Sequence, residues 1–292
     1  FGGCQICVIG DLVQLSPVLT ENEKDVFYNK YETPFFFGAD CFNKKDFEFK
    51  EFTKIFRQSE QKFINLLNQI RDNSLDAEGF NLINQRVDKA KDQEDAIILC
   101  ATNNVADYIN QQRLDKINKP EYVYIAEATG EFELAKQLPA PSELVLKEGA
   151  QVMFVKNDLD KRWVNGTIGK VSKITDEALF VTVEDNVFEL KQEMWEIIKY
   201  EYSEEKGRVV EVVKGTFKQI PLQLAWAITI HKSQSKTFDK VIVDLGSGAF
   251  ASGQAYVALS RCRTFEGLKL RRPLRQSDII CDKTIARFLK GF

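Results

Sequence analysis

The chain has 292 residues, enough for two domains with sizeable cores. Apolar residues make up 44% and charged residues 28%, and no apolar run approaches the roughly 18 residues of a membrane span, so we expect no membrane contact. The formal charge of −3 does not by itself indicate nucleic-acid binding, which would need a local basic stripe.

The first residues, FGGCQICVIGD, lack the leader and cleavage site of a signal peptide and start within what reads as a strand, so we expect a fragment. Cys4 and Cys7 have redox or zinc spacing but lie in an apolar run without a second pair or a nearby His. We therefore expect core cysteines and no metal site. Scattered reduced thiols predict a cytoplasmic (bacterial) or nuclear protein that is not secreted.

Residues 3–9 form an apolar run that predicts a buried strand, and Asp11 and Gln14 follow it. An acid and an amide beyond a buried strand are candidates for reading the terminal phosphate of a bound nucleotide. Alternatively, Asp11 caps the turn that follows, and the residues alone favour this interpretation. The aromatic run Phe35–Phe37 either stacks on bases or packs in the core, and packing is favoured.

Residues 47–56 alternate as a strand does and lead to Arg57 and Gln58. A helix follows, with Ser59 as its expected N-cap, because apolar side chains recur at helical spacing at Phe63, Leu66, Leu67 and Ile70. An arginine at a strand-to-helix junction is suited to reaching a phosphate, although a plain surface role is equally compatible with the residues.

Residues 96–100 predict another buried strand, and the next helix opens at Thr102 and Asn103. These side chains either cap the helix or donate to a phosphate, because helix N-termini attract anions. Capping is the favoured interpretation.

From about residue 119 the pattern changes to short strand-like runs separated by turn residues. The runs cover residues 122–126, 144–155, 168–174, 179–190, 194–202 and 208–213. They predict a small antiparallel barrel or sandwich between two pieces of an α/β domain.

Residues 222–227, 241–245 and 267–270 read as strands, with a helix over 254–261. Thr229 stands where a helix cap would be, followed by the only histidine, His231, and by Lys232, Ser233 and Gln234. This order predicts a parallel sheet covered by helices, whose ligands gather at the carboxyl ends of the strands. Donors clustered at that edge favour a ligand carrying phosphates.

A local basic stripe follows the helix predicted over 254–261. It contains Arg261, Arg263, Lys269, Arg271, Arg272 and Arg275 against the single acid Glu266. This stripe is the candidate electrostatic surface for nucleic acid.

Five segments resemble helicase motifs in their usual order. They are GDLVQLSPV at 10–18, FRQ at 56–58, NGTIG at 165–169, TIHKSQ at 229–234, and YVALSR at 256–261. Together they are similar to the Pif1/RecD-like helicases of superfamily 1B, and the likeness covers nearly the whole chain.

The resemblance implies two RecA-like domains, which are α/β folds of the P-loop type, with ATP and Mg²⁺ between them. The sequence has no G-x-x-x-x-G-K-[ST] loop and no Asp-Glu pair before Gly10. We therefore expect residues 1–46 to be a remnant of the first RecA-like domain and to lack its N-terminal part. Residues 47–145 and 221–292 would form the second, interrupted at 146–220 by a small antiparallel β-barrel.

The same resemblance implies roles for individual residues. Gln14 would sense the γ-phosphate, and Arg57 and Arg261 would be catalytic arginine fingers, worth roughly 10³–10⁵ in rate. Nucleotide binding would involve Asp11, Gln58, Lys232, Gln234 and Ser235, and DNA binding Thr102, Asn103, Asn165, Thr229 and His231. The family has Gly where this chain has Ser235, so the close backbone geometry of that motif is in question.

The implied function is the C-terminal part of an ATP-dependent helicase that moves 5′ to 3′ on single-stranded or forked DNA. The chain alone, without the phosphate loop, is expected to be inactive. The alternative is a non-catalytic nucleic-acid-binding or interaction module derived from a helicase.

Overall fold

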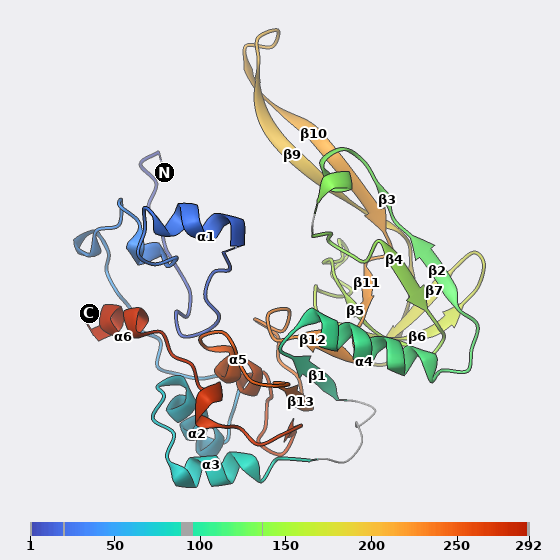
Figure 1. Cartoon of the computed structure of the whole chain (residues 1–292). Coiled ribbons are helices and arrows are strands. Elements are labelled where there is room, and N and C mark those ends of the chain that lie inside the picture. The colour runs from blue at the N-terminus through green and yellow to red at the C-terminus, as the bar shows by residue number, and fades with distance from the viewer. Residues whose placement is uncertain (1, 20, 89–95, 136, 291–292) are drawn as a thin grey trace. The chain divides into compact units, whose positions relative to one another are not determined.

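The computed structural model describes residues 2–19, 21–88, 96–135 and 137–290. The chain divides into two compact units (Figure 1). One, here called the α/β unit, contains Phe1–Val105 and Ile228–Phe292, and the other, the β unit, contains Ala106–Ala227. The helix α4 (Asn103–Asp115) runs from one into the other. The three-part division into 1–46, 47–145 with 221–292, and 146–220 stays a prediction.

The α/β unit is built on a four-stranded sheet in the order β12-β1-β13-β14. The strands are β12 (Ala227–Thr229), β1 (Ile97–Cys100), β13 (Val241–Asp244) and β14 (Leu268–Leu270). The β1–β13 and β13–β14 pairs are parallel, so the predicted parallel sheet is confirmed. The predicted strand at 222–227 is wrong as a member of this sheet: residues 222–224 pair antiparallel with residues 152–154 in the other unit, and the sheet takes Ala227–Thr229 instead. All four residues of β1 are buried, as expected for a strand covered on both faces.

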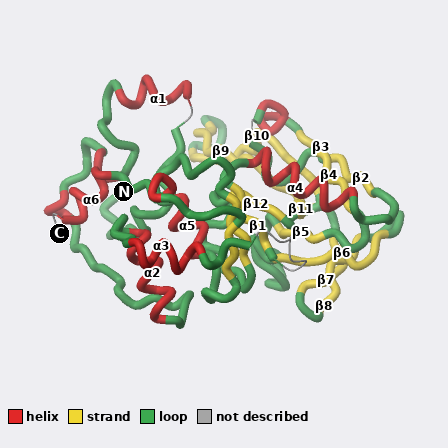
Figure 2. Tube along the Cα trace, turned by 60° about the horizontal axis from the view of Figure 1, so that its bottom comes forward, coloured by secondary structure: helices red, strands yellow, loops and turns green. Residues whose placement is uncertain are grey.

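Three helices of this unit lie side by side in both views (Figures 1 and 2): α2 (Gln61–Arg71), α3 (Ala77–Asn84) and α5 (Gln254–Ser260). The apolar spacing that predicted α2 is its buried face, Phe63, Leu66, Leu67 and Ile70. Its N-cap is Glu60 rather than the predicted Ser59. Glu60 Oε1 accepts from Phe265 N across the fold, so the start of the helix is fixed by a tertiary contact.

Two predicted strands are wrong. Residues 3–9 and 47–56 form no strand, and the side chains of Ile9, Phe52 and Phe56 are more than four-fifths exposed. The thiols of Cys4 and Cys7 are exposed too, so they are not core cysteines. A strand needs a neighbour that takes its backbone hydrogen bonds, and the described residues offer none to either segment.

The aromatic run packs against the C-terminal helix α6 (Lys283–Lys290). The rings of Phe37 and Phe288 stack with centroids 4.1 Å apart, and Phe36 and Phe42 approach Phe288 to 5.9 Å. This agrees with the packing interpretation of the run. Short helices lie in the same stretches: α1 (Glu21–Tyr28), η1 (Phe36–Gly38) and η2 (Lys44–Asp46).

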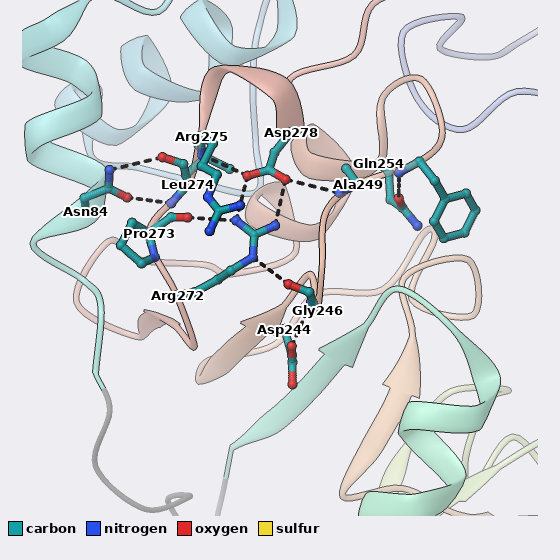
Figure 3. A network of polar contacts seen from close by, with 11 residues as sticks. Asn84, Asp244, Gly246, Ala249, Gln254, Arg272, Pro273, Leu274, Arg275 and Asp278 are labelled. Carbon is teal, nitrogen blue, oxygen red and sulfur yellow. Dashed lines mark hydrogen bonds and ion pairs between the residues drawn. The ribbon is translucent and has the colours of Figure 1, made fainter.

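A buried ion pair fixes the turn after β14 (Figure 3). Asp278, in η4 (Gln276–Asp278), accepts two hydrogen bonds from Arg272, at 2.7 and 2.8 Å. The backbone N–H groups of Ala249 and Arg275 donate to the same carboxylate. Arg272 Nε also donates to Gly246 O at 2.7 Å, so one charge pair joins the loop after β13 to the turn after β14.

The β unit consists of strands and the helix α4 (Figure 2). Its sheets are all antiparallel: β2-β4, β3-β10-β9 and β11-β5-β6-β7-β8. The bounds are β2 (Tyr122–Ile125), β3 (Glu127–Ala128), β4 (Glu143–Leu146), β5 (Gln151–Phe154), β6 (Ile168–Ile174), β7 (Leu179–Val183), β8 (Asn186–Leu190), β9 (Glu193–Ser203), β10 (Arg208–Gln219) and β11 (Leu222–Leu224), with η3 (Gly130–Leu134).

The predicted antiparallel strands of the β unit are confirmed, with two long runs each split by a turn. The predicted barrel is not, because the sheets of the described residues are open and their end strands do not pair with each other. Two buried amides tie the unit together instead. Gln219 donates to Tyr124 O and Pro141 O, and Asn110 of α4 donates to Ala227 O and accepts from Ala227 N.

Within the described ranges, no helix combines the length and apolar character needed to cross a membrane. The same residues contain no group of three His, Cys, Asp or Glu side chains placed to bind a metal ion.

Removing the carboxylate of the buried pair should strongly destabilise the fold. We expect Asp278→Asn to lower the free energy of unfolding by about 3–5 kcal/mol, because Arg272 is left as a buried, unpaired charge. Urea denaturation followed by circular dichroism measures this loss. As a matched control, Asp239→Asn breaks the exposed Arg263–Asp239 pair and should change stability by about 0.5 kcal/mol or less. Equal effects of the two substitutions would contradict the assignment.

Candidate functional site

The most unusual charged group is Arg261, at the C-cap of α5, with 1% of its surface exposed. Its guanidinium donates to Val257 O (2.9 Å), Ser260 Oγ (2.8 Å) and Lys236 O (3.4 Å). All three acceptors are neutral, and no carboxylate of the described residues forms an ion pair with it. A buried cation with neutral partners only is costly, and the cost falls when an anion binds.

Arg57 lies beside Arg261. Its Nε donates to Thr237 Oγ1 at 2.9 Å, and its Nη1 lies 3.5 Å from Ser260 O. Both arginines therefore bond to Ser260, Arg57 to its carbonyl and Arg261 to its hydroxyl. The structure brings together the two residues that the sequence predicted as a pair.

The charges of the pair are coupled. Burial, with the charge of Arg57 in support, lowers the pKa of Arg261 to about 10, while Tyr256 and Asp11 oppose the shift. Burial also lowers the pKa of Arg57. With a pKa of about 10, Arg261 still carries its charge at neutral pH, so the site is a local concentration of positive charge.

Gln58 holds the backbone on which the arginines are mounted. The residue is buried, and its Nε2 donates to Ser260 O (2.9 Å) and Cys262 O (2.8 Å). Both amide hydrogens are thus used by the protein. Gln58 therefore positions the end of α5. The resemblance predicted Gln58 as a nucleotide-binding residue, but donating these amide hydrogens to a nucleotide would break the two bonds that hold α5.

Asp11 and Gln14 form a turn at the same site. Asp11 accepts from Val13 N (3.2 Å) and from Gln14 Nε2 (3.1 Å), so it caps the turn as the residues alone indicated. The turn lies against the start of α5, because a Cβ at Gly253 would be 2.3 Å from Val13 O. Gly253 has φ +72°, so only glycine fits this approach.

Sequence reasoning missed two members of the site, Arg71 and Tyr256. Arg71, in the last turn of α2, pairs with Asp11 at 3.7 Å. Burial raises the pKa of Tyr256, Asp11 adds to the shift, and the arginines 71, 261 and 57 oppose it, so the tyrosine lies amid all four charges. No motif marked Arg71, whereas Tyr256 opens the recognised YVALSR run.

The segment after β12 is a series of tight turns, not the helix that Thr229 was expected to cap. Thr229 Oγ1 accepts from Lys232 N at 3.3 Å, and Ser233 N donates to Thr229 O. Ser235 has φ +63°, the left-handed backbone that favours glycine. The following residue, Lys236, supplies the carbonyl that Arg261 binds.

The predicted DNA contacts of the α/β unit lie near one another at the sheet edge. Ile230 N donates to Cys100 O at 2.9 Å, which joins the turn after β12 to the end of β1. Thr102 and Asn103, just beyond β1, are exposed at the start of the 13-residue helix α4. His231 is half-buried, and burial lowers its pKa.

Asn165 belongs to the β unit. It lies in the loop between β5 and β6, where its backbone N–H donates to Asn157 Oδ1 and its side chain is exposed. Lys232 and Gln234 belong to the turn after β12, where Lys232 is exposed and Gln234 partly buried.

The predicted basic stripe is not a free surface. Arg261 is buried, Arg272 pairs with Asp278, Lys269 with Asp88, and Arg263 with Asp239. Three of these basic residues are paired with acids and a fourth is buried, so the local excess of basic residues in the sequence overstates the charge available to a polyanion.

Comparisons with known proteins point to one family. Residues 133–174 match the family model described as DNA helicase Pif1, 2B domain. The ATP-dependent DNA helicase Pif1 of Bdellovibrio bacteriovorus is 30% identical over 314 residues, which span 100% of this chain and 63% of that protein. The human ATP-dependent DNA helicase PIF1 is 35% identical over 287 residues, spanning 92% of this chain and 41% of that protein.

Solved structures give the same result. The crystal structure of Bacteroides Pif1 bound to ssDNA is similar with a TM-score of 0.78 and 34% identity, over 100% of this chain and 67% of that one. Bacteroides Pif1 in complex with ADP-AlF3 and ssDNA gives a TM-score of 0.75 and 33% identity, over 97% and 65%. The mixed α/β fold with its parallel sheet is that of a DNA helicase. The chain belongs to the Pif1 family.

Replacing the strained serine should stabilise the turn. We expect Ser235→Gly to raise the free energy of unfolding by about 0.5–1 kcal/mol, because glycine adopts φ +63° without the left-handed penalty. Urea denaturation measures the gain. Ser235→Ala keeps the penalty and should give no gain, and a glycine variant less stable than the alanine variant would refute the strain.

The only histidine allows a clean test of its burial. Since burial lowers its pKa, the ring-proton NMR signals of His231 should titrate with a midpoint below 6.5. The unfolded chain then binds more protons than the folded one as pH falls through 6.5, so the wild type should lose stability there relative to His231→Gln. A midpoint at or above 6.5 would mean that the ring is solvated or paired.

Proposed function

We propose that the protein containing this chain is an ATP-dependent DNA helicase to which this chain contributes two arginine fingers. The observation that carries the proposal is the buried Arg261, bonded only to neutral groups and adjacent to Arg57. The chain spans about two thirds of the Bdellovibrio relative, so the activity is proposed for the longer protein.

ATP fits the residues present. Arg57 and Arg261 offer two guanidinium groups to a triphosphate, and Gln14 lies on the turn that packs against α5. ATP supplies the phosphoryl transfer, in which negative charge spreads over the transferred oxygens. The two arginines would stabilise that charge, and Lys232, Gln234, Ser235 and Asp11 are the further residues proposed to bind the nucleotide. Gln58 and Thr237 keep the arginines in place.

Mg²⁺ does not fit the described residues, which contain no metal-binding group of three ligands. Its ligands, like the phosphate-binding loop, would come from a first RecA-like domain that precedes this sequence in the longer protein. The exposed apolar side chains of residues 3–9 and 47–56 support such a domain, because these segments have strand-like sequences but no neighbouring strand among the described residues.

Single-stranded or forked DNA is the proposed substrate along which the helicase moves. Thr102, Asn103 and His231 would contact its backbone or bases in the α/β unit, and Asn165 in the β unit. Thr229, predicted as a further contact, is buried and instead holds the turn that carries His231. The N-terminus of α4 suits a phosphate. Because burial lowers the pKa of His231, its ring is neutral at pH 7 and contributes stacking or a hydrogen bond rather than charge. Movement from 5′ to 3′ rests on the superfamily 1B likeness.

Removing one finger in the longer protein should abolish turnover. We expect Arg261→Ala to lower the DNA-stimulated ATPase rate by roughly 10³-fold or more, because the buried cation acts on charge formed in the transition state. Phosphate release measures it. Arg263→Ala, two residues away in an exposed ion pair, is the matched control and should keep the rate within about twofold.

Other outcomes separate the alternatives. The 292-residue chain alone should release no phosphate, and turnover by it that Arg261→Ala removes would overturn the two-domain site. A longer protein that binds single-stranded DNA yet never turns over ATP would instead be a non-catalytic module derived from a helicase.

A further inference from the structure

The β9–β10 hairpin has a face that no described residue of the β unit covers. The strands have 11 and 12 residues and pair from Ser203–Arg208 at the turn to Glu193–Gln219 at the base, with one bulge between Val213 and Gly215. In Figure 1 they extend as a two-stranded ribbon beyond the short strand β3 that pairs with β10. Residues directly opposite each other share a face of such a ribbon.

One face is packed. Trp195 and Phe217 are cross-strand partners whose ring centroids lie 5.8 Å apart, and Phe132 of η3 approaches Phe217 to 5.7 Å. Lys199, four residues further along β9 and on the same face, pairs with Glu131 of η3. The helix η3 therefore covers this face, and its apolar residues belong to the structure of the unit.

The opposite face is apolar and open. It carries the cross-strand pairs Ile198–Val213 and Tyr202–Val209, with Tyr200 between them. The exposed fractions are 43% for Ile198, 51% for Val213, 69% for Tyr200, 66% for Tyr202 and 59% for Val209. Soluble monomers rarely expose such a contiguous apolar set without a binding role.

The charges on this face select the partner. From Glu196 to the turn, the open face carries the carboxylates of Glu196 and Glu211 and no Lys or Arg. A nucleic acid could stack on the two tyrosines, but its phosphates would meet these carboxylates. A second copy of the chain would likewise bring two carboxylates from each copy together.

We propose that the open face of the β9–β10 ribbon binds a protein segment that is apolar on one side and carries Lys or Arg at its edge. An amphipathic helix laid across the ribbon would bury the tyrosines and valines while its basic residues pair with Glu196 and Glu211. The surface is built independently of Arg57 and Arg261, so it stands whether or not ATP is hydrolysed.

The test uses the whole 292-residue chain and a labelled helical peptide of leucine and lysine, with fluorescence anisotropy as the readout. We expect binding that weakens at least about tenfold in the double variant Tyr200→Ser, Tyr202→Ser, because both rings leave the contact. Val187→Ser, on the exposed side of β8, is the matched control and should leave binding unchanged.

Reversing the two charges tests whether the carboxylates favour a basic partner, without removing apolar surface. With Glu196→Lys and Glu211→Lys, the leucine–lysine peptide should lose affinity and a leucine–glutamate peptide should gain it. The proposal fails if the tyrosine variant binds the peptide as the wild type does. It also fails if oligothymidylate competes for the tyrosines, or if the chain dimerises through this face in light scattering.

Discussion

A buried guanidinium without a carboxylate is the constraint on which the rest of the α/β unit depends. Arg261 has lost its water, yet it bonds only to two backbone carbonyls and one hydroxyl. Elsewhere in the described residues a largely buried arginine meets its acid directly, as Arg272 meets Asp278. Arg272 is thus neutralised within the fold, whereas Arg261 has no acid of its own, and this difference is the basis of the arginine-finger role proposed for it.

Three distant segments cooperate to hold that charge. Residues 57–58, 236–238 and 260–263 meet through hydrogen bonds, and those from Arg57 and Gln58 to residues 260 and 262 span 202 to 204 positions of the sequence. Phe238 N donates to Arg261 O, and Arg263 N donates to Phe238 O, so two backbone hydrogen bonds join the end of the turn after β12 to the end of α5. His231 lies at the other end of that turn. A shift of the turn would therefore move the carbonyl of Lys236, and with it a partner of Arg261.

Sequence patterns predicted the strands whose pairing partners lie nearby along the chain. Most strands of the β unit followed from alternation and turn residues because β5 to β8, and β9 with β10, pair with strands next to them along the chain. The parallel sheet was equally readable from β1, β13 and β14. Residues 3–9 and 47–56 have the same apolar character but no partner strand, and their pattern failed. The site itself came from the motif resemblance, and Arg71 and Thr237, which no motif marks, emerged only from tertiary contacts.

The left-handed backbone at Ser235 shows how strongly the surrounding contacts specify the turn. A serine pays about 1 kcal/mol or more for φ +63°, yet the conformation persists where the family has glycine. It is held from both sides: Lys236 N donates to Ser233 O, and Lys236 O accepts from Arg261. Relaxing the serine to a negative φ would redirect the next carbonyl and remove an acceptor from the buried cation. The backbone strain at Ser235 is thus offset by the hydrogen bond that the Lys236 carbonyl accepts from the buried Arg261.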